Sequence, residues 1–413
     1  MVMLRGGMMK KSLFAVAYWV LIDILFLAII GVFTTHPINW FIAILIVGLC
    51  SVFSIVKSIK DTGYIKQTLA LPENNHKPVY DYIRALAVLF IMFVHVLAMD
   101  WPYASGMAGT PLYEVLNLIR CISGVGGNCL FLMISGALLL RFKDENLLTF
   151  YGRRFTKIIV PLVIYYFYYL WEYNAQRYTS FTTAIYKIIT ADYSKANVHH
   201  FWLIYVIISL YVLVPFLRYM LKEMPYKKMT AMIIVLYVYF VLTKVIINEN
   251  AMPMNFTFWL LIFLIGYWYS LDESRKYDGI AMIAGVVALI LFEVAIHLNP
   301  PMSDDLAAHY PYMIVTSVGI MAIFFKLGDK LKNVYLIRLI SQYSYGIILG
   351  HMLVLVFAVR KYCYTFTSSL MHKGMGFLFL SLATLIGSVI IAYFIDNITV
   401  KPISAIFDIK KRK

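Results

Sequence analysis

Charged residues are scarce in this chain. They make up 14% of its 413 residues, and only 21 residues are Asp or Glu. A composition with so little charge and so much apolar surface excludes an ordinary soluble domain. Cysteine is scarcer still, with four residues at scattered positions, Cys50, Cys121, Cys129 and Cys363. Their spacing excludes a disulfide framework and a cysteine-based metal site.

Long apolar segments fill most of the chain. Hydrophobic residues make up 62% of the sequence, and the mean hydropathy is +0.78. The segments run for about 20 residues, which is the length of a membrane-spanning helix, and they lack the two-residue alternation of an outer-membrane barrel. We therefore predict an all-α integral membrane protein with about 12 transmembrane helices. The predicted spans are 12–33, 38–56, 82–99, 114–140, 158–173, 200–220, 230–247, 255–271, 279–297, 311–326, 344–361 and 376–397.

The net charge of +15 agrees with this topology. When the N-terminus is placed in the cytoplasm, the predicted cytoplasmic segments hold most of the 36 Lys and Arg residues. This bias is the positive-inside rule, and it predicts that both termini are cytoplasmic. The positive charge therefore requires no nucleic-acid partner. We predict a multi-pass protein of the cytoplasmic membrane.

A polar segment divides the chain. Residues 57–79 form a predicted cytoplasmic linker between two N-terminal spans, 1–56, and a ten-helix core, 80–400. The tail, 401–413, is basic and is expected to rest on anionic membrane lipids. The first span is too long for a signal-peptide core and lacks a small-residue cleavage site, so we expect it to be retained. With no appended soluble domain, we expect the chemistry to take place in the membrane core.

Two ionisable residues lie on one apolar segment, with ten residues between Arg84 and His95. Such groups are costly in lipid and usually face the bundle interior or a water-filled path. In a helix, steps of about 100° place both side chains on one face, and steps of about 1.5 Å separate them by roughly 16 Å. The spacing indicates one extended ligand, anchored at an anionic end and reactive at its far end. Taken singly, Arg84 is equally typical of an interfacial anchor paired with Asp81, and His95 of a side chain bonded to a nearby carbonyl.

Two further segments carry candidate residues. The glycine-rich stretch 124–136 includes Asn128, which could donate to an oxyanion, although dense glycine is also typical of tight helix packing. The basic run 151–157 contains Arg153, Arg154 and Lys157. This run is typical of a topology signal and equally of a phosphate site, because guanidinium groups match phosphate oxygens.

The sixth span opens on its outer side with histidines and aromatic residues. Trp202 and Tyr205 are candidates for substrate binding, although aromatic residues at this level ordinarily mark the membrane interface. The adjacent His199 and His200 are compatible with a metal, but no third ligand is evident, so we predict no metal site. His351 is a further histidine within a predicted span.

Taken together, these segments resemble the bacterial membrane-bound acyltransferase 3 family, which includes surface-polysaccharide O-acetyltransferases. The resemblance covers about residues 79–400, and it begins with the arginine, ten residues, histidine pattern of Arg84 and His95. Four more segments follow in the family's order, 127–136, 153–161, 201–215 and 344–351. One position departs from the pattern. Lys157 stands where members often carry a second arginine, and lysine keeps the charge but loses the bidentate fork.

The resemblance implies transfer of an acyl group, expected to be acetyl, from cytoplasmic acyl-CoA. The acceptor would be a sugar hydroxyl of an envelope polysaccharide or a lipid-linked glycan on the outer side. Coenzyme A is anionic at its nucleotide end and reactive at its thioester end, which fits the spacing of Arg84 and His95. We expect the donor phosphates to bind at the cytoplasmic side to Arg84, Arg153, Arg154 and Lys157.

The same resemblance gives roles to the remaining candidates. His95 would act as general base on the acceptor hydroxyl, with a covalent acyl-histidine intermediate left open. Asn128, or a backbone N–H of the glycine-rich stretch, would stabilise the oxyanion. Trp202, Tyr205 and His351 would bind the acceptor.

Two other classes of function are compatible with the topology. A secondary transporter also has many spans and cytoplasmic ends, but it should show repeated halves and broken helices at corresponding places, and neither is evident in the sequence. A non-catalytic partner in envelope synthesis could keep the fold without the chemistry. The presence of both Arg84 and His95 argues against that alternative.

Overall fold

The computed structural model describes residues 2–61 except 34–36, then 63–65, 77–98, 110–174, 198–246, 254–299, 306–360 and 375–406. Every regular element in this part of the chain is a helix, and the described residues contain no strand. In chain order the elements are α1 (Val2–Phe33), α2 (Pro37–Lys60), α4 (Pro78–Ala98), α6 (Pro111–Leu139), α7 (Leu147–Arg154), η1 (Phe155–Ile159), α8 (Val160–Asn174), η2 (His199–Phe201), α10 (Trp202–Lys222), α11 (Tyr226–Ile246), α12 (Met254–Tyr269), η4 (Asp272–Tyr277), α13 (Asp278–Leu298), α14 (Leu306–Lys326), η6 (Gly328–Lys330), α15 (Tyr335–Gln342), α16 (Ser344–Leu353), η7 (Val354–Arg360), α18 (Met375–Ile395), η9 (Asp396–Val400) and α19 (Lys401–Ile406).

The prediction of an all-α membrane protein is confirmed. Within the described residues, six helices are long and apolar enough to cross a membrane, and a bent pair raises the number to seven. Three shorter apolar helices, 12–28, 257–269 and 310–326, accompany them. The chain is therefore a multi-pass membrane protein, while the total of about 12 spans stays a prediction.

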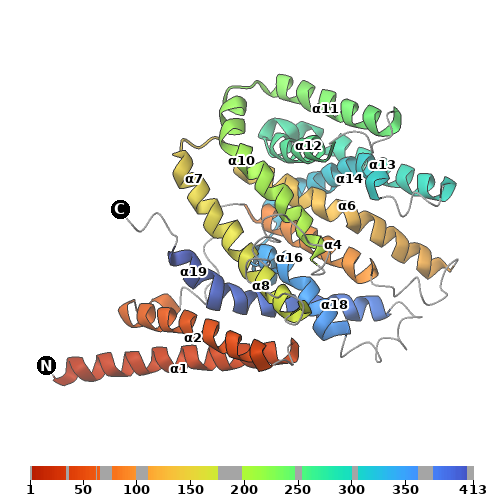
Figure 1. Cartoon of the computed structure of the whole chain (residues 1–413). Helices are drawn as coiled ribbons and strands as arrows, with labels where there is room; N and C mark the ends of the chain where they lie inside the picture. Colours follow the sequence, from red (N-terminus) through yellow and green to blue (C-terminus); the bar gives the residue numbers. More distant parts are fainter. Residues whose placement is uncertain are drawn as a thin grey trace.

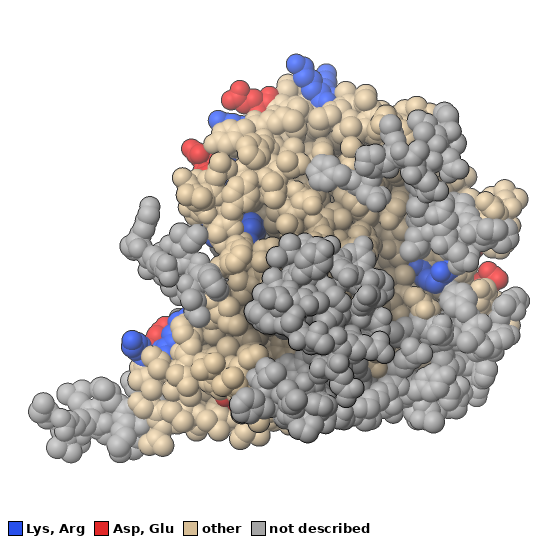
Figure 2. Space-filling model, viewed as in Figure 1, with Lys and Arg blue, Asp and Glu red and all other residues tan. Residues whose placement is uncertain are grey.

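The outer surface of the bundle is apolar, as a lipid-facing surface must be. On α13, the side chains of Ile280 and Ile283 are each 68% exposed, and Val286 on the next turn is 57% exposed. Figure 2 shows the same character on one face, where acidic and basic side chains lie in a few small groups among uncharged residues. Soluble monomers do not expose apolar side chains in such continuous rows.

Helix α4 lies inside the bundle, packed against α6, α15, α16 and α18 (Figure 1). The glycine-rich stretch of α6 lets the backbones of neighbouring helices approach closely. A Cβ atom on Gly127 would lie 2.8 Å from the backbone nitrogen of Ile91 in α4. One on Gly136 would collide with the backbone carbonyl of Phe263 in α12. Tight packing therefore accounts for two of these glycines without any catalytic role.

This packing makes Gly136→Ala a test of the fold. The added methyl group must push α6 away from α12, and overpacking of this kind costs about 1–3 kcal/mol. We expect the variant to unfold at a lower temperature in detergent than the unchanged protein. Gly279→Ala, in α13, is the matched control, because a Cβ atom there meets nothing within 4 Å. Equal melting temperatures for the two variants would contradict the close approach of α6 and α12.

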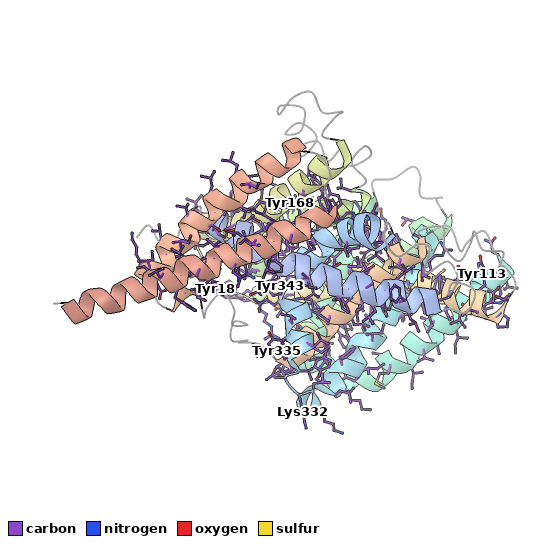
Figure 3. All side chains as sticks on the ribbon, turned by 90° about the horizontal axis from the view of Figure 1, so that it is seen from below. Tyr18, Tyr113, Tyr168, Lys332, Tyr335 and Tyr343 are labelled. Atoms are coloured by element: carbon purple, nitrogen blue, oxygen red, sulfur yellow. The ribbon has the colours of Figure 1, made fainter. Side chains whose placement is uncertain are left out.

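Helices α15 and α16 together form one further candidate span. Residues 335–342 and 344–356 pass as a membrane span only together, and they are bent by 74° at Tyr343. The predicted span 344–361 begins just after this bend, and its described residues, 344–360, are helical as α16 and η7. Figure 3 shows Tyr335 at an edge of the molecule and Tyr343 farther in. The bend brings Ser341, at the end of α15, into the interior, where it is buried.

The two N-terminal helices form a pair along one side of the bundle (Figure 1). Trp19 of α1 donates to the hydroxyl of Ser58 in α2 over 2.8 Å, and Phe26 stacks on Phe394 of α18. The C-terminal segment is attached to the same region. Of the predicted tail 401–413, residues 401–406 form α19, and the Ser404 hydroxyl donates to the Thr156 carbonyl. Residues 407–413, and residues 66–76 of the predicted linker, lie outside the described part of the chain.

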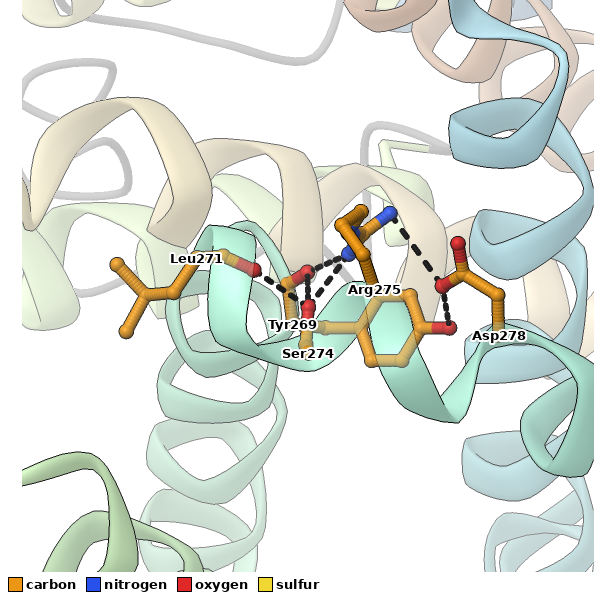
Figure 4. Close-up of polar contacts among 5 residues, drawn as sticks. All are labelled: Tyr269, Leu271, Ser274, Arg275 and Asp278. Atoms are coloured by element: carbon orange, nitrogen blue, oxygen red, sulfur yellow. Dashed lines mark hydrogen bonds and ion pairs between the residues drawn. The ribbon is translucent and has the colours of Figure 1, made fainter.

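A cluster of polar contacts fixes the turn between α12 and α13 (Figure 4). Arg275 donates to the Tyr269 carbonyl and to the Ser274 hydroxyl, and its guanidinium lies 3.5 Å from the Asp278 carboxylate. The Tyr269 hydroxyl donates to the same carboxylate over 2.7 Å. These contacts link the end of α12 to Asp278, the first residue of α13.

Candidate functional site

Arg84 and His95 both lie on α4, and they contact the same neighbouring segment. Arg84 donates over 3.4 Å to the hydroxyl of Ser341 in α15, and the His95 ring lies 4.9 Å from that of His351 in α16. The two side chains therefore share a face of the helix, as their spacing predicts. The helical rise separates them by roughly 16 Å. Both are partly buried.

Three histidines meet at one end of this face, and we call them the histidine cluster: His95, His200 and His351. The ring centroids of His200 and His351 are 5.0 Å apart, and those of His95 and His200 are 6.0 Å apart. His200 and His351 are almost fully buried, with 4% and 1% exposure. His95 alone keeps a partly exposed side chain.

The hydrogen bonds of His95 leave one ring nitrogen able to accept a proton. Its Nδ1 lies 2.6 Å from the Ile91 carbonyl in the preceding turn of α4. A carbonyl only accepts, so Nδ1 carries the hydrogen and Nε2 is the accepting nitrogen. A neutral imidazole with this arrangement is suited to general-base catalysis.

His351 has the same arrangement of donor and acceptor. Its Nδ1 lies 2.8 Å from the Ile348 carbonyl, so Nε2 is again the accepting nitrogen. This Nε2 atom is buried and has no hydrogen-bond partner among the described residues. A buried acceptor without a donor is costly, and a hydroxyl group of a bound molecule would supply the missing bond.

Arginines define the other end of the face. The Ser341 hydroxyl, which accepts from Arg84, donates to the carboxylate of Asp81 over 2.6 Å. Arg84 also lies near Tyr211 of α10. Arg154 of α7 lies over the same tyrosine, with its guanidinium carbon 5.5 Å from the ring centroid. We call Arg84, Arg154, Tyr211 and Ser341 the arginine end.

The other members of the basic run have different surroundings. Arg153 forms an ion pair with Glu145, and Arg218 lies 3.8 Å from the same carboxylate. One carboxylate is therefore shared by two arginines, which leaves a net positive charge at this group. Lys157 is exposed in η1. Of the three residues in this run that were predicted to bind the donor, the structure brings Arg154 to the arginine end with Arg84.

Each of three segments of the bundle supplies one residue to the arginine end and another to the histidine cluster. The pairs are Arg84 and His95 on α4, Tyr211 and His200 on α10 and its entry η2, and Ser341 and His351 on α15 and α16. On α4 and on the α10 segment the two residues are eleven positions apart, and on the bent α15–α16 segment they are ten apart. The histidine cluster and the arginine end are therefore opposite ends of one interior region, which is enclosed by the same segments.

The remaining predicted residues lie beside this region. The Asn128 side chain donates to the Gly124 carbonyl in its own helix over 3.0 Å, which uses one of its two amide hydrogens. Tyr205 lies near Tyr345 of α16, which in turn lies near Tyr211, so Tyr205 is close to the interior region. Trp202 instead packs on Trp259 of α12, with ring centroids 5.2 Å apart.

The described residues contain no group of three or more His, Cys, Asp or Glu side chains placed to hold a metal ion. In the histidine cluster, the Nδ1 atoms of His95 and His351 are engaged by carbonyl groups of their own helices.

The sequence did not identify His200 or Ser341 as members of the histidine cluster and the arginine end. Their contacts are with residues far away in the sequence, and the one available signal was that His200 precedes the Trp202 segment.

Comparison with protein-family models identifies the family of this chain. A model described as an acyltransferase domain matches residues 78–393, which is well over half of the chain. The chain therefore belongs to the membrane-bound acyltransferase 3 family, and the match begins at the start of α4, after the two N-terminal helices. No curated protein and no solved structure matches the chain significantly. The family supports an acyltransferase embedded in the membrane.

Proposed function

We propose that the protein transfers an acyl group, expected to be acetyl, from cytoplasmic acyl-CoA to a hydroxyl of an envelope glycan or glycolipid on the outer side. The observation that carries this proposal is the pair of chemically different ends on one interior region. The arginine end suits phosphate groups, and the histidine cluster, roughly 16 Å away along α4, suits a reacting thioester. Coenzyme A has this polarity, with phosphates at one end and the thioester at the other.

The donor phosphates bind at the arginine end. Guanidinium groups donate two parallel hydrogen bonds to phosphate oxygens, and such charge-assisted bonds are about twice as strong as neutral ones. Arg84 and Arg154 are the principal residues of this site, because both lie near Tyr211. Arg153 and Lys157 contribute positive potential from the rim. The pantetheine arm then extends along α4 toward His95.

The reaction takes place at the histidine cluster. Nε2 of His95 removes the proton from the acceptor hydroxyl, and the oxygen attacks the carbonyl carbon of the thioester. The second amide hydrogen of Asn128, or a backbone N–H, stabilises the oxyanion that forms. When the carbon–sulfur bond breaks, the departing thiolate takes the proton from His95, which returns the imidazole to its starting state.

The acceptor binds beside His95. The accepting Nε2 of His351 takes a hydroxyl of the glycan, which would satisfy its missing hydrogen bond. Tyr205 and Trp202 contribute aromatic surface on the outer part of α10. Membrane lipids cover the apolar faces of the bundle, including the exposed face of α13.

Reconstituted vesicles test the function and its direction. The protein is inserted in one known orientation, with acetyl-labelled acetyl-CoA on the side of α7 and an envelope glycan on the other side. We expect label to appear on the glycan, and to disappear when donor and acceptor exchange sides. Transfer that needs both molecules on the same side would contradict the path through the bundle. Donor-independent movement of the glycan, with no transfer, would favour a transporter.

A further inference from the structure

Tyr169 of α8 connects two backbone groups of α16. Its hydroxyl donates to the Leu349 carbonyl over 2.8 Å and accepts from the Leu353 N–H over 3.1 Å. These groups are four residues apart, which is the spacing that an α-helix joins with a direct hydrogen bond. The side chain of Tyr169 is completely buried, so its hydroxyl has no water to bond instead. Immediately afterwards, at Val354, α16 continues as the wider helix η7.

His200 binds the same two oxygen atoms. Its Nε2 lies 3.2 Å from the Leu349 carbonyl oxygen and 3.2 Å from the Tyr169 hydroxyl oxygen. The carbonyl can only accept, and the single hydroxyl hydrogen of Tyr169 is already donated to Leu349. Nε2 of His200 must therefore carry a hydrogen and act as a donor. His200 holds this point of α16 from the side of α10, while Tyr169 holds it from α8.

The held turn contains His351. This histidine lies between Leu349 and Leu353, and its ring is 4.9 Å from that of His95. A shift of the turn would therefore change the distance from His351 to the base. Displacements of about 1 Å at a reacting group can cost about 10²-fold in rate.

We propose that Tyr169 and His200 are positioning residues that clamp the turn 349–353 and so hold His351 against His95. The clamp rests on the proposed function for its catalytic consequence, but its geometry is independent of it. Without the Tyr169 hydroxyl, the Leu349 carbonyl and the Leu353 N–H lose their bonds to α8, and the turn is held less firmly. His200 acts through its N–H donor and exchanges no proton with substrate.

The kinetic test uses Tyr169→Phe with Tyr165→Phe as a matched control. Tyr165 lies on the same helix, is equally buried and also loses a hydrogen bond, since its hydroxyl donates to Asp396 over 3.3 Å. We expect Tyr169→Phe to lower kcat for acetyl transfer by about 10-fold to 10²-fold. The KM for acetyl-CoA should stay unchanged, because the phosphates bind at the other end. Equal kcat values for the two variants would overturn the clamp.

Substitutions of His200 separate positioning from proton transfer. Glutamine can place an N–H donor near the position of Nε2 but does not titrate, whereas alanine has no donor. We expect His200→Gln to retain activity close to the unchanged protein, and His200→Ala to be impaired like Tyr169→Phe. If the folded glutamine variant is as inactive as the alanine variant, His200 transfers a proton during the reaction, and the proposal is wrong.

Spectra of protein labelled with ¹⁵N-histidine test the clamp without any turnover. We expect His200 to show the hydrogen on Nε2, and the His351 signals to shift in Tyr169→Phe but not in Tyr165→Phe. Unchanged His351 signals in Tyr169→Phe would overturn the clamp. If the unchanged protein transfers no acetyl group, the proposed function fails, and these spectra still decide whether the clamp exists.

Discussion

His95→Ala should lower the rate of acetyl transfer by about 10²–10⁴-fold, which is the usual contribution of a positioned general base. The expectation follows from the hydrogen bond that fixes Nδ1 as the donor and leaves Nε2 as the accepting nitrogen. The substitution removes the proton acceptor but leaves the arginine end unchanged. Binding of acetyl-CoA should therefore stay the same. The measurement is transfer of labelled acetyl to glycan, with donor affinity determined separately by calorimetry.

His297→Ala is the matched control for His95. His297 lies near the end of α13, and its Nδ1 is also bonded to a carbonyl in its own helix, that of Glu293. It differs in having a largely exposed side chain and no contact with the histidine cluster. We expect this variant to transfer acetyl at the normal rate. Normal transfer by a folded His95→Ala protein would remove His95 from the chemistry.

Arg84→Ala should weaken acetyl-CoA binding by about 10-fold to 10²-fold. A hydrogen bond to a charged group contributes about 1.5–3 kcal/mol, and each 1.4 kcal/mol changes the dissociation constant tenfold. The rate at saturating donor should fall much less, because the histidine cluster is unchanged. Arg84→Lys should give an intermediate affinity, since lysine keeps the charge without the fork. Calorimetric titration with acetyl-CoA measures all three proteins.

Ser341→Ala separates a donor-binding role of Arg84 from a structural one. Ser341 is bonded to both Arg84 and Asp81, so its loss breaks this link and leaves both charges in place. If Arg84 acts on donor phosphates, the serine variant should bind acetyl-CoA nearly as well as the unchanged protein. A loss of affinity equal to that of Arg84→Ala would mean that the link, rather than the guanidinium, is what matters.

The position of Arg84 relative to His95 could be predicted because it depends only on the period of one helix. Once the segment is helical, eleven steps place both side chains on one face, whatever surrounds them. The all-α class was equally predictable, because a membrane leaves few alternatives to helices. The structure confirms both predictions at α4.

The histidine cluster could not be predicted in the same way. His95, His200 and His351 lie on segments far apart in the chain, and only tertiary packing brings their rings within 6.0 Å. The role of Tyr169 is also invisible in the sequence, because an inward tyrosine on an aromatic helix is typical of core packing. Its hydroxyl becomes informative only when its partners on α16 are known.

The basic run shows a limit of a different kind. Arg153 and Arg154 are adjacent and chemically identical, so composition assigns both to phosphate binding. In the structure their side chains leave the helix in different directions. Arg153 pairs with Glu145, and Arg154 lies over the ring of Tyr211. The bend at Tyr343 was not predicted, because residues 335–342 lie outside the predicted span 344–361.

The central claim is that Arg84 and His95 bind the two ends of one acyl donor. The most direct measurement determines both the dissociation constant for acetyl-CoA and the transfer rate at saturating donor, for Arg84→Ala and His95→Ala prepared together. The account predicts opposite results, with weakened binding and little loss of rate for the arginine variant, and intact binding with lost transfer for the histidine variant. Parallel loss of binding and rate in both variants would contradict it.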